Sequence, residues 1–218
     1  QYVRRSGLPT FGLERAIKAG EIKPYYQPVI DLTTGRLAGC EVLVRWEKPN
    51  GETAQPGPFI DYAEMTGLAV PMTLRVMKQV KADLSGLCSL MPDLKISINL
   101  FDGHFRVTGI VDDVQAIFGG SPIAYRQIVF EITERRPLPE TPSATAVISG
   151  LHALGVRLAL DDAGTGHSNL AFMQTLGVDV IKIDRIFLEM IRPGVAQVPV
   201  LDGLIGMARD LGADIVAE

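Results

Sequence analysis

The sequence predicts an α/β fold with parallel strands joined by crossover helices, either a (β/α)8 barrel or an open doubly wound sheet. Short apolar or alternating runs of strand length recur along the chain, and stretches with helical spacing of apolar residues lie between most of them. Polar side chains at or near the C-terminal ends of several predicted strands bear on the choice between the two folds.

Composition and charge narrow the class of protein. The chain has 218 residues, of which 47% are apolar, which is enough for one well-buried domain. Its formal net charge is -4, with acidic and basic residues interspersed. Binding to DNA or RNA depends on clustered Lys and Arg, so no nucleic-acid partner is expected. A small anionic ligand held by metal ions stays compatible with this charge.

The cysteines and the apolar runs indicate a reduced, cytoplasmic domain. Cys40 and Cys88 lie far apart without CxxC spacing, so they are interpreted as structural thiols and not as a disulfide or zinc site. The longest apolar runs have strand length, and the N-terminus has no apolar leader segment, so neither a membrane span nor a signal peptide is expected. If the parent protein is anchored in the inner membrane, the anchor lies outside this sequence.

The first predicted element is an amphipathic helix. Apolar residues from Phe11 to Ile17 have near-helical spacing, and Gly20 is expected to end the helix. We interpret residues 1–20 as a lead-in helix or connector and residues 21–218 as the main domain.

Strand-length runs and helical stretches then alternate. The predicted strands are Tyr25–Ile30, Cys40–Trp46, Leu94–Leu100, Ile128–Thr133, Arg157–Leu160, Val180–Ile183 and Asp214–Ala217. The predicted helices are Pro58–Thr66, Met72–Leu84, Ile110–Ile117, Ala144–Leu154, Leu170–Leu176 and Val200–Leu211. Alternation of this kind requires parallel strands, because each helix returns the chain to the starting edge of the sheet.

Several of these strands carry polar residues where an active site is expected. At or near the C-terminal ends lie Asn99, Glu131, Asp161 with Asp162, Lys182 and Glu218, and Glu41 lies earlier, inside its strand. In a barrel the C-terminal ends of all strands meet at one mouth. Any single residue of this set is more simply interpreted as a helix cap or turn residue. Together they predict a metal site, because clustered carboxylates repel one another unless a cation or proton compensates them.

The ligand types indicate the metal and the chemistry. The set contains oxygen ligands without Cys or His, which favours Mg²⁺ or Mn²⁺ over zinc. The adjacent Asp161 and Asp162 are suited to hold two ions close together, and two ions are the usual apparatus of phosphodiester hydrolysis. Lys182 would add a cation for the phosphate or position the attacking water. The 3 histidines show no mutual ligand spacing, so structural or surface roles are expected for them.

A series of motifs resembles the EAL domain family. The segment EVLVRW at 41–46 is similar to the family's EALVRW signature, and YYQP at 25–28 is similar to its entry motif. Further similar segments are DLTTG at 31–35, SINL at 97–100, EITE at 131–134, DDAGTG at 161–166, KIDR at 182–185 and VAE at 216–218. The resemblance covers nearly the whole chain, and it implies a TIM-like (β/α)8 barrel of the EAL type.

The resemblance also implies an activity and residue roles. It implies a bacterial phosphodiesterase that hydrolyses cyclic di-GMP to linear pGpG with Mg²⁺ or Mn²⁺, expected as two ions. The implied metal ligands are Glu41, Asn99, Glu131, Asp161, Asp162 and Asp184. The implied catalytic residues are Lys182, Glu218 as a candidate general base, and Glu41. The implied contacts to the dinucleotide are Gln27, Leu43 and Arg45, and Glu134 is implied to steady the loop at 161–166.

Some positions depart from the family pattern. Ala163 replaces the usual Phe and His167 the usual Tyr, in the loop that links the metal site to the dimer interface, so different packing is expected there. Because the sequence stops at Glu218, the barrel is expected to lack its last strand and helix. The resemblance further implies a homodimer and a parent protein with upstream sensory or GGDEF domains.

Other functions remain open at this stage. A catalytically inactive EAL domain would act as a cyclic di-GMP receptor, or as a regulatory dimerisation module. An unrelated metal-dependent barrel enzyme would also accommodate the carboxylates alone. The hydrolase is favoured because a receptor does not need a complete set of metal ligands.

Overall fold

The structure is a computed structural model that describes residues 12–106, 109–133, 141–164, 176–193 and 197–218. Its strands are β1 (Ile22–Ile30), β2 (Leu37–Glu47), β3 (Thr53–Ala54), β4 (Lys95–Asn99), β5 (Ile128–Thr133), β6 (Arg157–Ala163), β7 (Val180–Ile183) and β8 (Asp214–Ala217). Its helices are α1 (Leu13–Ala19), α2 (Pro56–Thr66), α3 (Ala69–Leu90), α4 (Gly103–Arg106), α5 (Gly109–Phe118), α6 (Pro142–Leu154), α8 (Arg185–Leu188) and α9 (Pro199–Leu211), with a 3₁₀ turn at Tyr125–Gln127.

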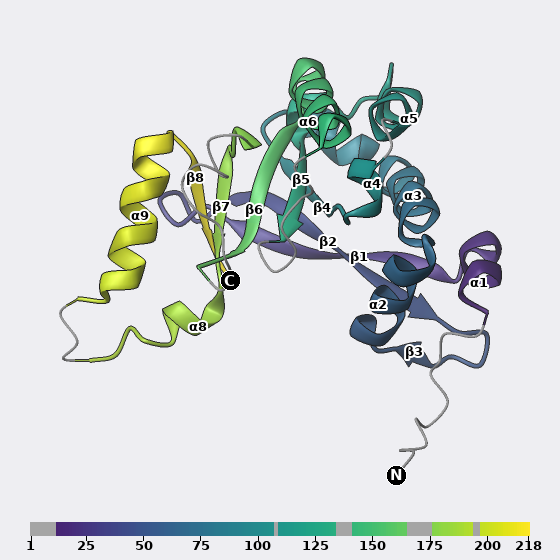
Figure 1. Ribbon diagram of the computed structural model, residues 1–218, viewed down its shortest axis with the longest axis horizontal. Coiled ribbons are helices and arrows are strands. Elements are labelled where there is room, and N and C mark those ends of the chain that lie inside the picture. Colours follow the sequence, from purple (N-terminus) through teal and green to yellow (C-terminus); the bar gives the residue numbers. More distant parts are fainter. Residues whose placement is uncertain (1–11, 107–108, 134–140, 165–175, 194–196) are drawn as a thin grey trace, which may run out of the picture.

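The strands form one sheet in the order β1-β2-β4-β5-β6-β7-β8, with the short β3 paired to β2. From β2 to β8 each neighbouring pair on this path is parallel. Helices α2, α3, α5 and α6 lie along one side of the sheet, and α9 lies beside β7 and β8 (Figure 1). The predicted α/β class with parallel strands is confirmed, and every strand predicted from the sequence is present.

The first two strands depart from the parallel arrangement. β1 and β2 pair antiparallel. Only residues 31–36 connect them, whereas a parallel connection needs about a dozen residues or more. The Asp31 carboxylate accepts the backbone N–H groups of Thr33 and Thr34 at 2.8 Å each, and Gly35 has a φ of 66°, so the chain reverses tightly. A hairpin therefore opens the sheet.

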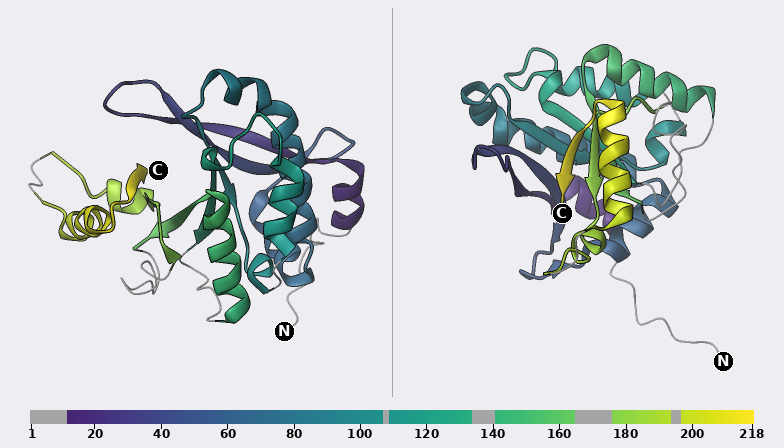
Figure 2. Two further views of the ribbon diagram at one scale, coloured as in Figure 1. Left: turned by 90° about the horizontal axis from the view of Figure 1, so that it is seen from above. Right: turned by 90° about the vertical axis from the view of Figure 1, so that its left-hand side faces the viewer.

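The sheet is a curled half-barrel. Among the strands that the structure describes, β1 and β8 are the two edges and do not pair with each other. The views in Figure 2 show the sheet curving so that its interior face is concave, with the helices outside. This curvature agrees with the expected TIM-like (β/α)8 arrangement of the sheet.

The main core lies between the sheet and the outer helices. The long helix α3 buries an apolar stripe that includes Met72, Val76 and Val80. Helix α1 buries Leu13, Ala16 and Ile17 in the same core and ends at Gly20, whose φ is 75°. The predicted helix is thus confirmed over its described part, whereas Phe11 lies outside the described residues. The domain boundary between residues 20 and 21 stays a prediction.

Most predicted helices agree with the structure to within two residues at each end, but α3 extends six residues beyond the predicted end at Leu84, to Leu90. The predicted helix Leu170–Leu176 stays a prediction, because it falls almost entirely outside the described residues. In the described ranges, no helix has both the length and the apolar character needed to cross a membrane.

Candidate active site

The concave face of the sheet carries an apolar layer with a polar layer above it. Val129, Ala159 and Val180 form a small buried cluster, against which Val216 packs. Two residues further along the same four strands come Glu131, Asp161, Lys182 and Glu218. Because side chains alternate with a period of two along a strand, each polar residue points to the same interior as the apolar residue before it. The polar layer is the one nearer the C-terminal ends of the strands.

Lys182 on β7 is the centre of this polar layer. Its ammonium nitrogen lies 3.2 Å from Glu41 Oε2, 2.9 Å from Glu131 Oε2, 3.1 Å from Asp161 Oδ1 and 2.5 Å from Glu218 Oε1. The four carboxylates come from β2, β5 and β6 and from the residue after β8. We call these five residues the carboxylate–lysine cluster. The predicted meeting of polar side chains from different strands is therefore observed.

Burial and charge set the protonation of the cluster. Burial opposes the charge of Lys182, but Glu131, Asp161 and Glu41 outweigh it and raise the pKa of Lys182. Burial raises the pKa of Glu131 well above its usual range, although Lys182 opposes this, and it also raises the pKa of Glu218. One ammonium thus faces four carboxylates, and the cluster favours a further cation or a bound proton.

A buried carboxylate oxygen without a hydrogen-bond partner indicates whether the cluster suits a metal ion. Glu131 is 1% exposed, and its Oε1 atom has no hydrogen-bond partner among the described residues. A buried carboxylate oxygen without a partner is costly, and a cation would satisfy it. The donors are all oxygens, which suits Mg²⁺ or Mn²⁺. The residues therefore fit a hard divalent metal chemically.

The side chains of the cluster, as they lie in this structure, do not form a coordination shell for a metal ion. Within the part of the chain described here, no three His, Cys, Asp or Glu side chains are grouped closely enough to hold one ion. The Lys182 ammonium lies at the point that the carboxylates share. Coordination of an ion would thus require side-chain movements around Lys182.

The other predicted metal ligands lie in different settings. Asn99 ends β4 and is in register with Glu131 on β5, which places it beside the cluster. Asp162 follows Asp161 in a β-bulge of β6 and has a φ of 56°, a left-handed conformation that Asp tolerates better than most residues. Asp184 caps helix α8, where its Oδ1 atom accepts the N–H of Ile186 at 2.8 Å. Glu134, the predicted loop-steadying residue, lies outside the described residues, as does His167.

The predicted substrate contacts lie on the β1–β2 hairpin. Gln27 is directly opposite Glu41 in the antiparallel register, so the two side chains share a face. Leu43 and Arg45 follow Glu41 at a period of two on this same face. Arg45 is four residues beyond Glu41, about 13 Å further along the strand. The hairpin thus extends the interior face from the cluster toward the mouth.

Sequence reasoning missed Tyr25 on this face. Tyr25 is opposite Leu43, and the guanidinium carbon of Arg45 lies 5.8 Å from the centroid of its ring. The Tyr25 hydroxyl donates a hydrogen bond to Glu47 Oε1 at 2.8 Å. The alternation of Lys23, Tyr25 and Gln27 along β1 was the available signal, since it places Tyr25 on the face of Gln27.

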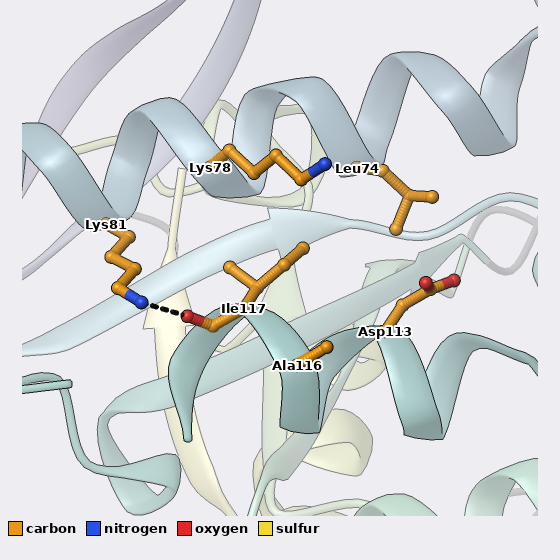
Figure 3. A pocket seen from close by; sticks show the side chains of 6 residues that line it. All are labelled: Leu74, Lys78, Lys81, Asp113, Ala116 and Ile117. Atoms are coloured by element: carbon orange, nitrogen blue, oxygen red, sulfur yellow. Dashed lines mark hydrogen bonds between the residues drawn. The ribbon is translucent and has the colours of Figure 1, made fainter. Parts of the chain in front are cut away.

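A separate pocket lies on the outer side of the molecule. It has a volume of about 440 Å³ and is lined by Leu74, Lys78, Lys81, Asp113, Ala116 and Ile117 (Figure 3). These residues belong to α3 and α5, and the Lys81 ammonium donates to the Ile117 carbonyl at the end of α5 at 2.6 Å. None of these residues belongs to the carboxylate–lysine cluster. Because the cluster, unlike this pocket, brings several carboxylates together, we place the candidate active site at the cluster.

The fold and the cluster define an α/β-barrel domain with an acidic site at the C-terminal ends of its strands. Comparison with known families specifies it further: the model of the EAL domain matches residues 12–218, and the chain belongs to this family. The resemblance seen in the sequence is thereby confirmed.

Known relatives give the context of this membership. The chain is 37% identical over 219 residues to the probable cyclic di-GMP phosphodiesterase PdeG of Escherichia coli K12, which covers 100% of the chain and 43% of the relative. It is 39% identical over 204 residues to the cyclic di-GMP phosphodiesterase PdeL of the same organism, with 93% of the chain and 56% of the relative covered. The chain therefore spans about half the length of these relatives.

A solved structure shows the same fold. The phosphodiesterase PaMucR in complex with c-di-GMP superposes with a TM-score of 0.83 at 28% identity, covering 95% of this chain and 84% of that one. The chain therefore shares its fold with a solved phosphodiesterase structure.

Proposed function

We propose that this domain hydrolyses cyclic di-GMP to linear pGpG with the help of divalent metal ions, Mg²⁺ or Mn²⁺, expected as two. The observation that carries the proposal is the carboxylate–lysine cluster, which unites four carboxylates from separate strands around one buried ammonium. The names of the relatives and the ligand of PaMucR support the same substrate.

The metal ligands of this proposal are those expected from the family pattern: Glu41, Asn99, Glu131, Asp161, Asp162 and Asp184. When bound, divalent ions would lower the pKa of a water molecule and neutralise charge on the phosphate. Glu131 would contribute its orphaned Oε1 atom, and Glu41 would reach the centre from the hairpin. Asp184 would combine this role with its capping of α8.

Residues of the cluster would accept the proton of the attacking water and would place a positive charge beside the phosphate. Hydrolysis adds a water oxygen to phosphorus and breaks one phosphorus–oxygen ester bond, so the water loses a proton and the leaving oxygen gains one. Glu218 is proposed as the general base, because its raised pKa lets a carboxylate hold that proton. Lys182 contacts Glu218 and offers a fixed positive charge to the reacting phosphate.

The hairpin face is proposed to hold the substrate. Arg45 would contact the anionic dinucleotide, while Gln27 and Leu43 line the path between Arg45 and the cluster. The span of about 13 Å between Glu41 and Arg45 along β2 gives room for a ligand larger than a single phosphate. Such a ligand would therefore reach the cluster and the hairpin at once.

The setting of the domain is also a proposal. We expect a homodimer, and a parent protein with upstream sensory or GGDEF domains that places this domain in the cytoplasm, with or without an inner-membrane anchor. Glu134 is proposed to steady the loop that begins at Asp161.

The direct test is hydrolysis of cyclic di-GMP by the full-length protein with Mg²⁺ or Mn²⁺, followed by chromatography of pGpG. Glu41→Ala is expected to abolish turnover. Glu14→Ala is the matched control, since Glu14 is an exposed glutamate of α1 whose ion pair with Lys18 is remote from the cluster. Binding of the dinucleotide without release of pGpG would replace the hydrolase by a receptor.

A further inference from the structure

Tyr25, Arg45 and Glu47 lie together on the β1–β2 hairpin. Of these three residues, only Arg45 has a role in the proposed function. Arg45 and Glu47 are two residues apart on β2, so their side chains share one face. Tyr25 on β1 contacts both of them. Its ring lies 5.8 Å from the Arg45 guanidinium carbon, and its hydroxyl donates to Glu47 Oε1 at 2.8 Å.

The two charged residues do not pair with each other. Among the described residues Arg45 forms no ion pair, and its Nη1 atom donates to the backbone carbonyl of Val44 at 3.0 Å. Side chains two residues apart on one strand lie on the same face, where opposite charges attract each other. Tyr25 offers each of them a different partner: its ring attracts the cation and its hydroxyl binds the carboxylate.

We propose that Tyr25 is a positioning residue that keeps Arg45 available to an anionic substrate by holding the Glu47 carboxylate away from it. This inference rests on the proposed function, in which Arg45 contacts the cyclic dinucleotide. A tyrosine hydroxyl is already protonated at physiological pH, and the bond to Glu47 raises the pKa of Tyr25 further, so the hydroxyl continues to donate. The arrangement therefore persists at physiological pH.

The first test is Tyr25→Phe, which keeps the ring and removes the hydroxyl. Glu47 then loses its donor and pairs with Arg45. The KM for cyclic di-GMP is expected to rise roughly threefold, the scale of one exposed ion pair, while kcat changes less than about twofold. A fall in kcat at unchanged KM would overturn the positioning role.

The second test is rescue. In the double variant Tyr25→Phe with Glu47→Gln, the neutral Gln cannot capture Arg45, so KM is expected to return close to the wild-type value. Tyr25→Leu removes ring and hydroxyl together, and its KM is expected to rise about tenfold. A merely structural role of Tyr25 would show no rescue by Glu47→Gln, and that result would also overturn the proposal.

A crystal structure of the Tyr25→Phe variant separates this inference from the proposed function. An Arg45–Glu47 nitrogen–oxygen distance of about 4 Å or less is expected in the variant. Side chains that stay apart would refute the role of Tyr25, whether or not the protein acts on cyclic di-GMP. If the wild-type protein neither binds nor cleaves cyclic di-GMP, the proposed function fails, and the variant structure still decides whether Tyr25 separates the two charges.

Discussion

The Lys182 ammonium lies 3.2 Å from Glu41 Oε2, although the two residues are 141 positions apart and β4, β5 and β6 separate their strands in the sheet. The contact therefore crosses the concave interior instead of following the hydrogen-bond ladder. It links the β1–β2 hairpin to β7. Lys182 is therefore the residue that connects carboxylates from both parts of the sheet.

Replacing Lys182 by Met is expected to destabilise the metal-free protein by about 3 kcal/mol or more, because four buried or half-buried carboxylates lose their cation. Added Mn²⁺ should restore part of this loss, since a metal replaces the missing charge. Thermal unfolding with EDTA and with Mn²⁺ measures both effects. Lys18→Met, at an exposed position, is the control and should change stability by less than about 0.5 kcal/mol. An identical loss with and without Mn²⁺ would argue against metal binding at the cluster.

Glu131→Gln is expected to separate stability from activity. Burial disfavours the charged form of Glu131, and Glu41 and Asp161 repel it, against the attraction of Lys182. A neutral amide removes the cost of burying a charge, so the metal-free variant should unfold at the same temperature as the wild type or a higher one. Hydrolysis should fall at least about 100-fold, because one proposed metal ligand loses its charge. The measurements are thermal unfolding and turnover on the same preparation. A variant that is less stable but equally active would contradict both expectations.

The backbone at Asp162 predicts a graded response to substitution. Its φ of 56° suits Gly and Asn, whereas a β-branched residue is strained there. Asp162→Val is expected to lose about 1–2 kcal/mol more than Asp162→Gly in urea unfolding. Asp162→Asn should fold normally and tests the proposed metal ligand through turnover alone. If the Val and Gly variants were equally stable, the bulge would not require this conformation.

His104 predicts a loss of stability in mild acid. It is 1% exposed, and burial lowers its pKa to about 4. The unfolded chain binds a proton near pH 6.5, whereas the folded protein resists it, so stability is full above that pH and declines as the pH falls toward 4. The expected decline is about 3 kcal/mol.

The variant His104→Leu isolates this effect from other titrating groups. Urea unfolding of wild type and variant at pH 7.5 and at pH 4.5 gives the difference in unfolding free energy at each pH. This difference should shrink as the pH falls, because proton binding at His104 stabilises the unfolded state of the wild type, whereas the variant has no imidazole at this position. Parallel pH profiles would show that His104 does not titrate as expected.

Much of the fold was predictable because it depends on local patterns. Alternating runs such as Leu94–Leu100, continuous apolar runs such as Val180–Ile183 and helical spacing such as that of Val200–Leu211 predicted the succession of the elements. The antiparallel start was not predicted, although the six-residue connection at 31–36 already excluded a crossover helix. The length of the connection between the first two strands would have predicted their antiparallel pairing.

The sequence by itself determined the succession of strands and helices, the family, and the polar residues at or near the ends of several strands. The tertiary structure decided how these residues meet: Lys182 occupies the centre of four carboxylates, and Tyr25 stands between Arg45 and Glu47. The physical reason is that alternation along one strand fixes only the face to which a side chain points. The distance between charges on different strands depends on the curl of the sheet and on the hairpin register, which only packing of the whole domain defines.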